Sequence, residues 1–208
     1  MHGGPVWVIV VAAGSGSRFG RPKQYEALAG ARVLDHAVAA ASGVADGIVL
    51  VVPPERGAEA EPSVDVVVAG GATRSASVRA GLAAVPADAA VVLVHDAARP
   101  LADAALFDSV LEAVRAGADA VVPGVPVVDS VRWRDGGAVD RDRLVAVQTP
   151  QGFAAAALRR AHADGGEASD DATLVEAAGG RVVVVDGEPA NRKITDPADL
   201  AVAERLLG

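Results

Sequence analysis

The sequence is poor in several kinds of residue, and each shortage excludes a class of protein. Cysteine is absent from the 208 residues, which excludes disulfides, thiolate catalysis and cysteine metal sites. Aromatic residues make up 3% of the chain and hydrophobic residues 51%, so we expect a core of valine, leucine and alanine. The four histidines, at positions 2, 36, 95 and 162, show no spacing typical of metal ligands.

Long apolar runs are also missing. None approaches the roughly 18 residues that a membrane-spanning helix needs, and the first residues lack the basic segment that begins a secretory signal. The formal net charge of −8 argues against nucleic acid or an anionic membrane as the main partner. These observations predict a soluble cytoplasmic protein, with residues 1–208 forming a single domain around a substantial core.

Lysine is scarce in an otherwise arginine-rich set of cations. Lys23 and Lys193 are the two lysines of the chain, against seventeen arginines. A lysine ammonium is a compact charge on a flexible stem, and a planar guanidinium cannot replace it without moving that charge. Both lysines lie within motifs described below, which favours a specific role for each, although chance could also leave two lysines in such a chain.

The stretch from Val6 to Gln24, VWVIVVAAGSGSRFGRPKQ, organises the chain. Its apolar start, Val6 to Val11, is short, continuous and β-branched, as in a buried strand. Small residues from Ala12 to Ser17 follow, and their N–H groups can approach oxyanions. Three cations come next: Arg18, Arg21 and Lys23. A strand, a small-residue loop and clustered cations predict a polyphosphate site in an α/β fold.

Two common phosphate loops do not fit this stretch. Glycines at positions 14, 16 and 20 give G-x-G-x-x-x-G, whereas the dinucleotide fingerprint needs G-x-G-x-x-G and an acidic residue after the second strand. That strand ends here in Val52-Pro53-Pro54. A Walker A loop needs G-x-x-x-x-G-K-[ST], which the chain lacks. A plain strand-to-helix turn with solvated arginines remains the alternative.

The remaining chain alternates strands and helices. We predict strands at 47–52, 64–69, 90–95, 119–123 and 181–185, helices at 33–42, 74–85, 103–116, 153–163, 170–178 and 197–207, and a partly helical turn at 53–62. This alternation predicts an α/β fold with a Rossmann-like, doubly wound, mostly parallel sheet. The alternation of strands and helices stops after Pro126. Apolar and polar residues alternate in 127–134 and again in 144–148, with a turn at 135–137 between them, which predicts a projecting β-hairpin arm at about 127–148. Such an arm exposes strand edges and usually pairs with something, although a solvated hairpin is the alternative.

Several motifs follow predicted strands or open helices. In Gly70–Val78 (GGATRSASV), the two glycines allow a ligand to approach the backbone closely. Thr73 or Ser75 of this motif could have the structural role of capping a helix. His95–Pro100 (HDAARP) ends a strand, where ligands of open α/β sheets bind. Asp96 there could hold hydroxyls or a magnesium shell, or it could cap a helix or pair with Arg99. The others are Asp129-Ser130 and Arg141 in the arm, Thr149-Pro150-Gln151, Ser169-Asp170-Asp171 (equally good as a helix cap), and Asn191–Thr195 (NRKIT).

Together these motifs, A-A-G-x-G-x-R with P-K-Q first, resemble in residues and order those of the 2-C-methyl-D-erythritol 4-phosphate cytidylyltransferase family, nucleotidyltransferases of non-mevalonate isoprenoid synthesis. The family usually has threonine where Ser130 stands, and the loop from Arg18 to Lys23 is shorter than in some members. The resemblance implies catalytic roles for Arg18, Lys23, Arg141 and Lys193. It implies substrate contacts from Ala12, Ala13, Gly14, Gly16, Gly71, Ser77, Asp96, Ala97, Arg99, Ser130, Thr149 and Ser169.

The resemblance also implies a reaction: transfer of CMP from CTP, with Mg²⁺ or another divalent cation, to 2-C-methyl-D-erythritol 4-phosphate. The metal's protein ligand is left unassigned. A homodimer is implied, in which the arm of one subunit reaches the active site of the other. Two alternatives stay open: a cytidylyltransferase for another polyol phosphate such as ribitol 5-phosphate, and a non-catalytic CTP-binding module.

Overall fold

A mixed, mostly parallel β-sheet forms the centre of the computed structural model, which describes residues 2–57, 59 and 61–208. Its strands are β1 (Val6–Val11), β4 (Gly47–Val52), β5 (Val66–Ala69), β6 (Val91–Asp96), β7 (Ala120–Pro126), β10 (Val145–Val147), β11 (Gln151–Ala154) and β12 (Val182–Asp186). Their order is β10-β7-β11-β6-β1-β4-β5, and β12 also pairs with β7. The predicted α/β fold with a mostly parallel sheet is confirmed.

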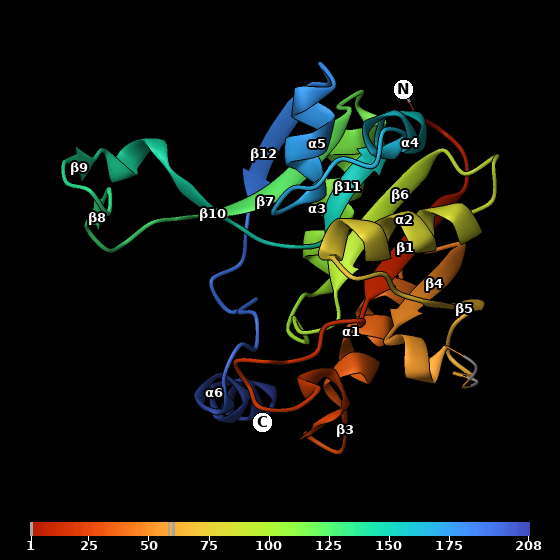
Figure 1. Cartoon of the computed structure of the whole chain (residues 1–208), viewed down its shortest axis with the longest axis horizontal. Helices are drawn as coiled ribbons and strands as arrows, with labels where there is room; N and C mark the ends of the chain where they lie inside the picture. Colours follow the sequence, from red (N-terminus) through yellow and green to blue (C-terminus); the bar gives the residue numbers. More distant parts are fainter. Residues whose placement is uncertain (1, 58, 60) are drawn as a thin grey trace.

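Helices cover both faces of this sheet (Figure 1). They are α1 (Val33–Ser42), α2 (Arg74–Ala84), α3 (Ala104–Arg115), α4 (Ala155–His162), α5 (Asp171–Ala177) and α6 (Pro197–Leu207). Alternate residues of β1 separate the two layers, because successive side chains of a strand point to opposite faces. Val8 and Val10 join the core cluster of α1 and α3, whereas Ile9 joins that of α2, α4 and α5.

Strand β11 differs from the prediction. Residues 153–163 were expected to be one helix, but Gln151–Ala154 form a buried strand that runs antiparallel between β6 and β7. Phe153 pairs with Val92 and Ala120 there. A Cβ on Gly152 would lie 2.6 Å from Val110 of α3, so glycine permits this close packing. Tertiary packing therefore overrides the helical propensity of an alanine-rich run.

The arm projects from the body of the molecule, as predicted, but its pairing differs (Figure 1). Its hairpin consists of the short strands β8 (Val131–Arg132) and β9 (Ala138–Val139). The prediction that 144–148 pairs with 127–134 is wrong, because β10 pairs with Gly124–Pro126 of β7. Strand β7 runs three residues beyond its predicted end at residue 123, and this extension supplies the partner for β10.

Shorter elements complete the chain. They are η1 (Lys23–Tyr25), β2 (Ala27–Leu28), β3 (Ala31–Arg32), η2 (Pro54–Arg56) and η3 (Arg141–Arg143). Helix η2 accounts for the predicted helical part of segment 53–62, of which positions 58 and 60 lie outside the described residues. In the described part of the chain, no helix combines the length and apolarity needed to cross a membrane.

Gly81 lets α2 pack closely against the sheet. A Cβ there would lie 2.6 Å from Ile9 Cγ2 and 2.9 Å from Val51 Cγ2. Gly81→Ala gains about 1 kcal/mol of helix propensity, but overpacking costs about 1–3 kcal/mol. We expect a lower free energy of unfolding in urea. Ala83→Gly, on the exposed face of the same helix, is the control, because it changes helix propensity without changing the packing against the sheet. A higher free energy of unfolding for Gly81→Ala would contradict the close packing at Gly81.

Candidate active site

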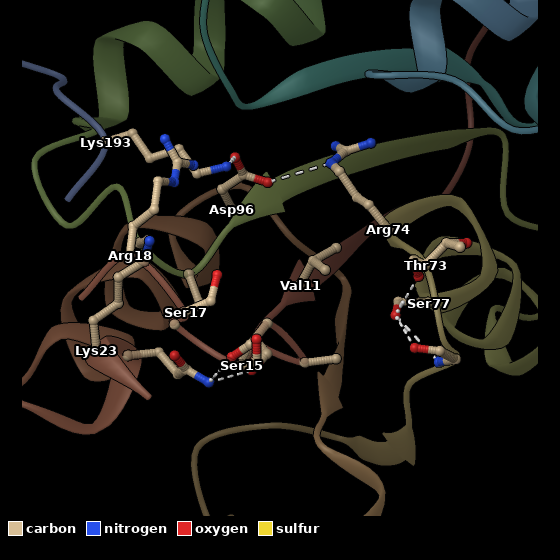
Figure 2. A pocket seen from close by; sticks show the side chains of 18 of the residues that line it. Val11, Ser15, Ser17, Arg18, Lys23, Thr73, Arg74, Ser77, Asp96 and Lys193 are labelled. Carbon is tan, nitrogen blue, oxygen red and sulfur yellow. Dashed lines mark hydrogen bonds and ion pairs between the residues drawn. The ribbon is translucent and has the colours of Figure 1, made fainter. Parts of the chain in front are cut away.

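A pocket of about 420 Å³ opens where β1, β5 and β6 end. The carboxyl ends of neighbouring parallel strands meet at this edge of the sheet, which is where open α/β sheets bind ligands. Figure 2 shows the side chains that line it. They come from four segments: 11–18 with 23 and 24, 71–74 with 77, 96–98, and Lys193. The first, third and fourth of these segments carry the charged residues that the motifs singled out.

The small-residue loop after β1 is held in one conformation. Gly16 has a φ of +68°, and a Cβ there would lie 1.9 Å from the carbonyl oxygen of Arg21. The buried amide of Gln24 donates to the carbonyl oxygens of Ala12 (2.6 Å) and Gly14 (3.1 Å). The loop carbonyls are therefore bonded to Gln24, and the backbone can face the pocket without rearranging.

Three cations share one side of the pocket: Arg18, Lys23 and Lys193. Burial lowers the pKa of the Lys23 ammonium, and the charges of Lys193 and Arg18 lower it further. Mutual repulsion of this kind stores unfavourable energy that a bound polyanion would relieve. The pocket is thus electrostatically suited to a polyphosphate, although the chain as a whole is acidic.

Asp96 is the one carboxylate among the residues that line the pocket. Its Oδ2 accepts a 2.6 Å bond from Lys193 Nζ, and its Oδ1 lies 3.6 Å from Arg74 Nε. Burial alone would raise the pKa of Asp96, but Lys193 and Arg74 hold it well below its usual range. Asp96 is therefore ionised at neutral pH. Its ion-pair partners are Lys193 and Arg74 rather than Arg99, the partner considered from the sequence.

Behind Asp96, the neutral imidazole of His95 orders Thr149. His95 Nε2 must donate to the carbonyl oxygen of Arg99 (3.2 Å), so Nδ1 accepts from the Thr149 hydroxyl (3.2 Å). The same hydroxyl oxygen accepts from the backbone N–H of Asp96 (3.0 Å). Burial lowers the pKa of His95 to about 4. His95 is consequently a structural group, and it positions the backbone of Asp96 through Thr149.

The opposite wall of the pocket is built from the Gly70–Val78 motif. Thr73 caps α2 by accepting from Ala76 N (3.0 Å), which confirms the structural alternative for that residue. Ser77 Oγ accepts from Gly71 N (3.2 Å) and donates to Thr73 O (2.9 Å). A Cβ on Gly71 would lie 2.6 Å from the Cβ of Ala76. This wall therefore presents backbone groups and the Ser77 hydroxyl, beside the side chains of Thr73 and Arg74.

The pocket brings together most of the residues that the sequence singled out: Ala12, Ala13, Gly14, Gly16, Arg18, Lys23, Gly71, Ser77, Asp96, Ala97 and Lys193. Thr149 is buried behind it, and Arg99 donates to the carbonyl oxygens of Asn191 and Val147. Ser169 is exposed, and Asp170 beside it caps α5. Ser130 and Arg141 lie in the arm, outside the pocket lining of their own chain. The roles of all these residues, inside the pocket lining and outside it, remain predictions.

Gln24 and Arg74 are among the pocket residues that sequence reasoning missed, and they make the contacts that hold its parts together. Gln24 was visible as the last letter of P-K-Q, and Arg74 as the arginine of the glycine motif. Gln24 contacts Ala12 and Gly14 within its own stretch, and Arg74 contacts Asp96 of another segment. The motifs therefore contained both residues, but spacing alone did not indicate what they touch.

The donor set fits a divalent cation that arrives with a nucleotide. Within residues 2–57, 59 and 61–208, no group of three or more histidines and carboxylates could hold a metal ion by itself. Mg²⁺ is commonly held by one or two carboxylates together with substrate phosphates. The ionised Asp96 carboxylate meets that requirement.

We predict that Gly16→Ala abolishes ligand binding by the loop, whereas Gly20→Ala does not. Both glycines have positive φ, +68° and +88°, so both variants pay about 1–2 kcal/mol for the left-handed conformation. Only the Gly16 Cβ meets another atom, since nothing lies within 4 Å of a Cβ on Gly20. Titration calorimetry with CTP measures the difference, and equal loss in both variants would contradict the collision.

We also predict that mild acid destabilises the protein through His95. Its pKa is about 4 when folded and about 6.5 when unfolded, so the unfolded state binds more protons between these values. The free energy of unfolding should fall by about 1.5 kcal/mol from pH 6.5 to pH 5 through this group. Urea unfolding at both pH values tests this, because His95→Gln should flatten the dependence. If the free energy of unfolding of His95→Gln depended on pH as strongly as that of the wild type, another group would be responsible for the dependence.

Comparison with known proteins places the chain in a family. The family model for 2-C-methyl-D-erythritol 4-phosphate cytidylyltransferase (IspD) matches residues 6–208. The protein of that name from Rhodococcus jostii is 47% identical over 217 residues, which cover 98% of this chain and 96% of the relative. One from Nocardia farcinica is 48% identical over 218 residues, covering 98% and 94%. The crystal structure of the enzyme from Thermus thermophilus is similar, with a TM-score of 0.82, 40% identity and coverage of 95% and 97%.

Proposed function

The chain belongs to the 2-C-methyl-D-erythritol 4-phosphate cytidylyltransferase family, and from this membership we propose how its pocket performs the reaction. The protein is a CTP-dependent nucleotidyltransferase of isoprenoid precursor synthesis. It transfers CMP from CTP to 2-C-methyl-D-erythritol 4-phosphate, giving 4-diphosphocytidyl-2-C-methyl-D-erythritol and pyrophosphate. We also propose a cytoplasmic location, where CTP is available.

The observation that supports these roles is the cation cluster. Arg18, Lys23 and Lys193 converge on one pocket (Figure 2), and two of these charges depress the pKa of the third. Arg18 and Lys23 follow the small-residue loop, so we assign them to the triphosphate together with the backbone of that loop. Lys193 comes from the opposite end of the chain and meets the acceptor phosphate.

The reaction needs alignment and charge more than proton transfer. A phosphate oxygen of the acceptor attacks the α-phosphorus of CTP, a P–O bond forms, and the bond to the bridging oxygen of the β-phosphate breaks to release pyrophosphate. The acceptor phosphate is largely ionised at neutral pH, since its second pKa is about 6. It therefore needs no general base. Arg18 and Lys23 stabilise the charge that builds up on the α-phosphate and on pyrophosphate.

The nucleotide is held by backbone and by few side chains. We assign the triphosphate to the loop of Ala12, Ala13, Gly14 and Gly16, and the cytosine to Gly71 and Ser77. We assign the ribose to Asp96 and Ala97 at the end of β6. A wall of backbone groups cannot change rotamer, so a wrong base would leave buried polar groups unpaired.

Mg²⁺ enters as part of the nucleotide substrate. Its protein ligand would be the ionised Asp96 carboxylate, which is within reach of the loop that carries the phosphates. Bound there, the metal would neutralise charge on the triphosphate. Asp96 itself stays ionised because Lys193 and Arg74 flank it.

The arm supports a homodimer that completes each pocket. Large apolar side chains are exposed along it: Val128, Trp133, Leu144, Val145 and Val147. The Trp133 side chain, the largest of them, is 66% exposed. Exposed apolar side chains grouped in this way mark interaction sites. The arm, which carries Ser130 and Arg141 in sequence, extends away from the body of its own chain (Figure 1). We assign both residues to the acceptor phosphate in the pocket of the partner subunit. Arg99 and Thr149 support the pocket of their own chain from behind, because their side chains are already bonded to protein groups. Ser169 stays a predicted substrate contact.

Release of pyrophosphate tests the function. The full chain is assayed with Mg²⁺ and CTP in three parallel reactions: with 2-C-methyl-D-erythritol 4-phosphate, with ribitol 5-phosphate, and without acceptor. We expect release with the first acceptor alone. Release with ribitol phosphate alone would keep the nucleotide site and overturn the acceptor. Binding of CTP without release in any reaction would indicate a nucleotide-sensing module.

Mixing two inactive variants tests the shared site. Lys23→Ala removes a charge next to the α-phosphate and should lower kcat by about 10²–10³-fold, and Arg141→Ala should also be impaired. In a mixed dimer, one pocket regains both residues if Arg141 crosses to the partner. After subunit exchange we expect about one quarter of wild-type activity, because half of the dimers are mixed and each has one intact pocket.

The control for this mixture is a pair of variants from the same side of the site. Lys23→Ala mixed with Lys193→Ala should recover nothing, since both residues line the pocket of one chain. Recovery in the first mixture alone supports the shared pocket. No recovery in either, with dimers shown by sedimentation, would assign Arg141 to its own chain.

A further inference from the structure

A chain of buried and half-buried charges leads away from the pocket. Lys193 Nζ donates to Asp96 (2.6 Å), and the other oxygen of Asp96 lies 3.6 Å from Arg74 Nε. Arg74 Nη1 in turn donates to Asp171 Oδ2 at 2.7 Å. The Arg74 guanidinium is thus held between two carboxylates, one inside the pocket and one on α5.

Asp171 is the innermost member of this chain of charges. It is fully buried at the first residue of α5, and its Oδ1 accepts from His162 Nε2 at 3.0 Å. Because a carboxylate only accepts, the hydrogen of His162 resides on Nε2, and Nδ1 is buried without a partner among the described residues. Asp171 therefore has a fixed orientation, with one oxygen committed to Arg74.

We propose that Asp171 is a positioning residue, which holds the Arg74 guanidinium at the pocket wall so that Asp96 stays paired with Lys193. This role rests on the proposed function for what the pocket binds. Burial by itself would lower the pKa of Arg74, but Asp171 and Asp96 raise it overall, so the guanidinium is firmly charged. Of the two, Asp171 makes the hydrogen-bonded contact and Asp96 the longer one.

Loss of Asp171 would change which charges pair. Asp96 is the other carboxylate within ion-pair distance of Arg74 in the described part of the chain. A released guanidinium would close the 3.6 Å gap to Asp96 and compete with Lys193 for it. The carboxylate assigned to the ribose and the metal would then be covered, and the ammonium assigned to the acceptor phosphate would lose its fixed position.

A purely structural role for Asp171 has a matched control. Arg79 lies on α2 like Arg74, and it ties that helix to the segment before α5 through Glu167 (2.6 Å) and the carbonyl oxygen of Gly166 (2.7 Å). Arg79 does not line the pocket. If joining α2 to the 166–171 segment were all that mattered, Arg79→Ala would reproduce the effect of Asp171→Asn.

The test is CTP binding by full-length variants, measured by calorimetry without acceptor. Asp171→Asn keeps the size of the side chain and should weaken CTP binding by about tenfold to a hundredfold, the range of one charge-assisted hydrogen bond. Arg74→Ala should also weaken it, because Asp96 then loses one of its two flanking charges. The double variant should be no weaker than Arg74→Ala, because Asp171 acts through Arg74. Arg79→Ala should bind like the wild type.

Chemical rescue separates positioning from folding. Guanidinium ion at millimolar concentration should restore CTP binding to Arg74→Ala, where Asp171 can still hold it, and should not restore the double variant. Thermal unfolding shows whether each variant is folded. If Arg74→Ala does not fold, Arg74→Lys replaces it in the same comparison, and the double variant with Asp171→Asn should again be no weaker than the single one.

The outcomes are distinct. Additive losses in the double variant, equal rescue of both, or a loss in Arg79→Ala equal to that in Asp171→Asn would each overturn the positioning role. Failure of the wild type to release pyrophosphate while it still binds CTP would instead overturn the proposed function. The binding comparison would then still decide the role of Asp171, because it requires no acceptor.

Discussion

The buried carboxylate of Asp96 is the charge around which the pocket is arranged. A buried ion is costly unless it is paired and hydrogen-bonded, and Asp96 satisfies this with Lys193 on one side and Arg74 on the other. Its backbone N–H is bonded to Thr149. Since these three partners come from three separate segments, the chain must be fully folded before the pocket exists. An acidic protein thereby gathers positive charge at one edge of its sheet.

The scaffold makes that gathering possible through strand order. Strand β1 lies between β4 and β6 in parallel, so the small-residue loop and the Asp96 segment leave the sheet side by side. The buried amide of Gln24 then holds the loop carbonyls, and the collision built into Gly16 excludes other side chains. Helix α6 and Ile194 pack with Phe19 and Leu28 under the loop. The segment before α6 carries Lys193, so this small core also determines where the second lysine lies.

Sequence patterns correctly predicted those helices and strands whose bounds depend on neighbouring residues. Helix 33–42 and strand 47–52 have the predicted bounds, because periodicity and terminal glycines act over short distances. The strand at 151–154 and the partner of β10 could not be predicted, since both depend on how far β7 extends and on α3 packing against Gly152. At the site, motifs predicted which loops gather. They did not indicate that Gln24 and Asp171 act from behind, because a side-chain bond across 97 residues, such as Arg74 to Asp171, leaves no trace in spacing.

The scarcity of lysine has a practical consequence. Every side-chain amine of this chain, Lys23 and Lys193, lines the same pocket. The lowered pKa of Lys23 leaves more of it as the free amine, which is the nucleophilic form. Amine-directed acylating dyes and amine-coupled biosensor surfaces will therefore react with side chains only in this pocket. The enzyme should be immobilised through another chemistry, and a cleavable acyl label would report directly on pocket occupancy.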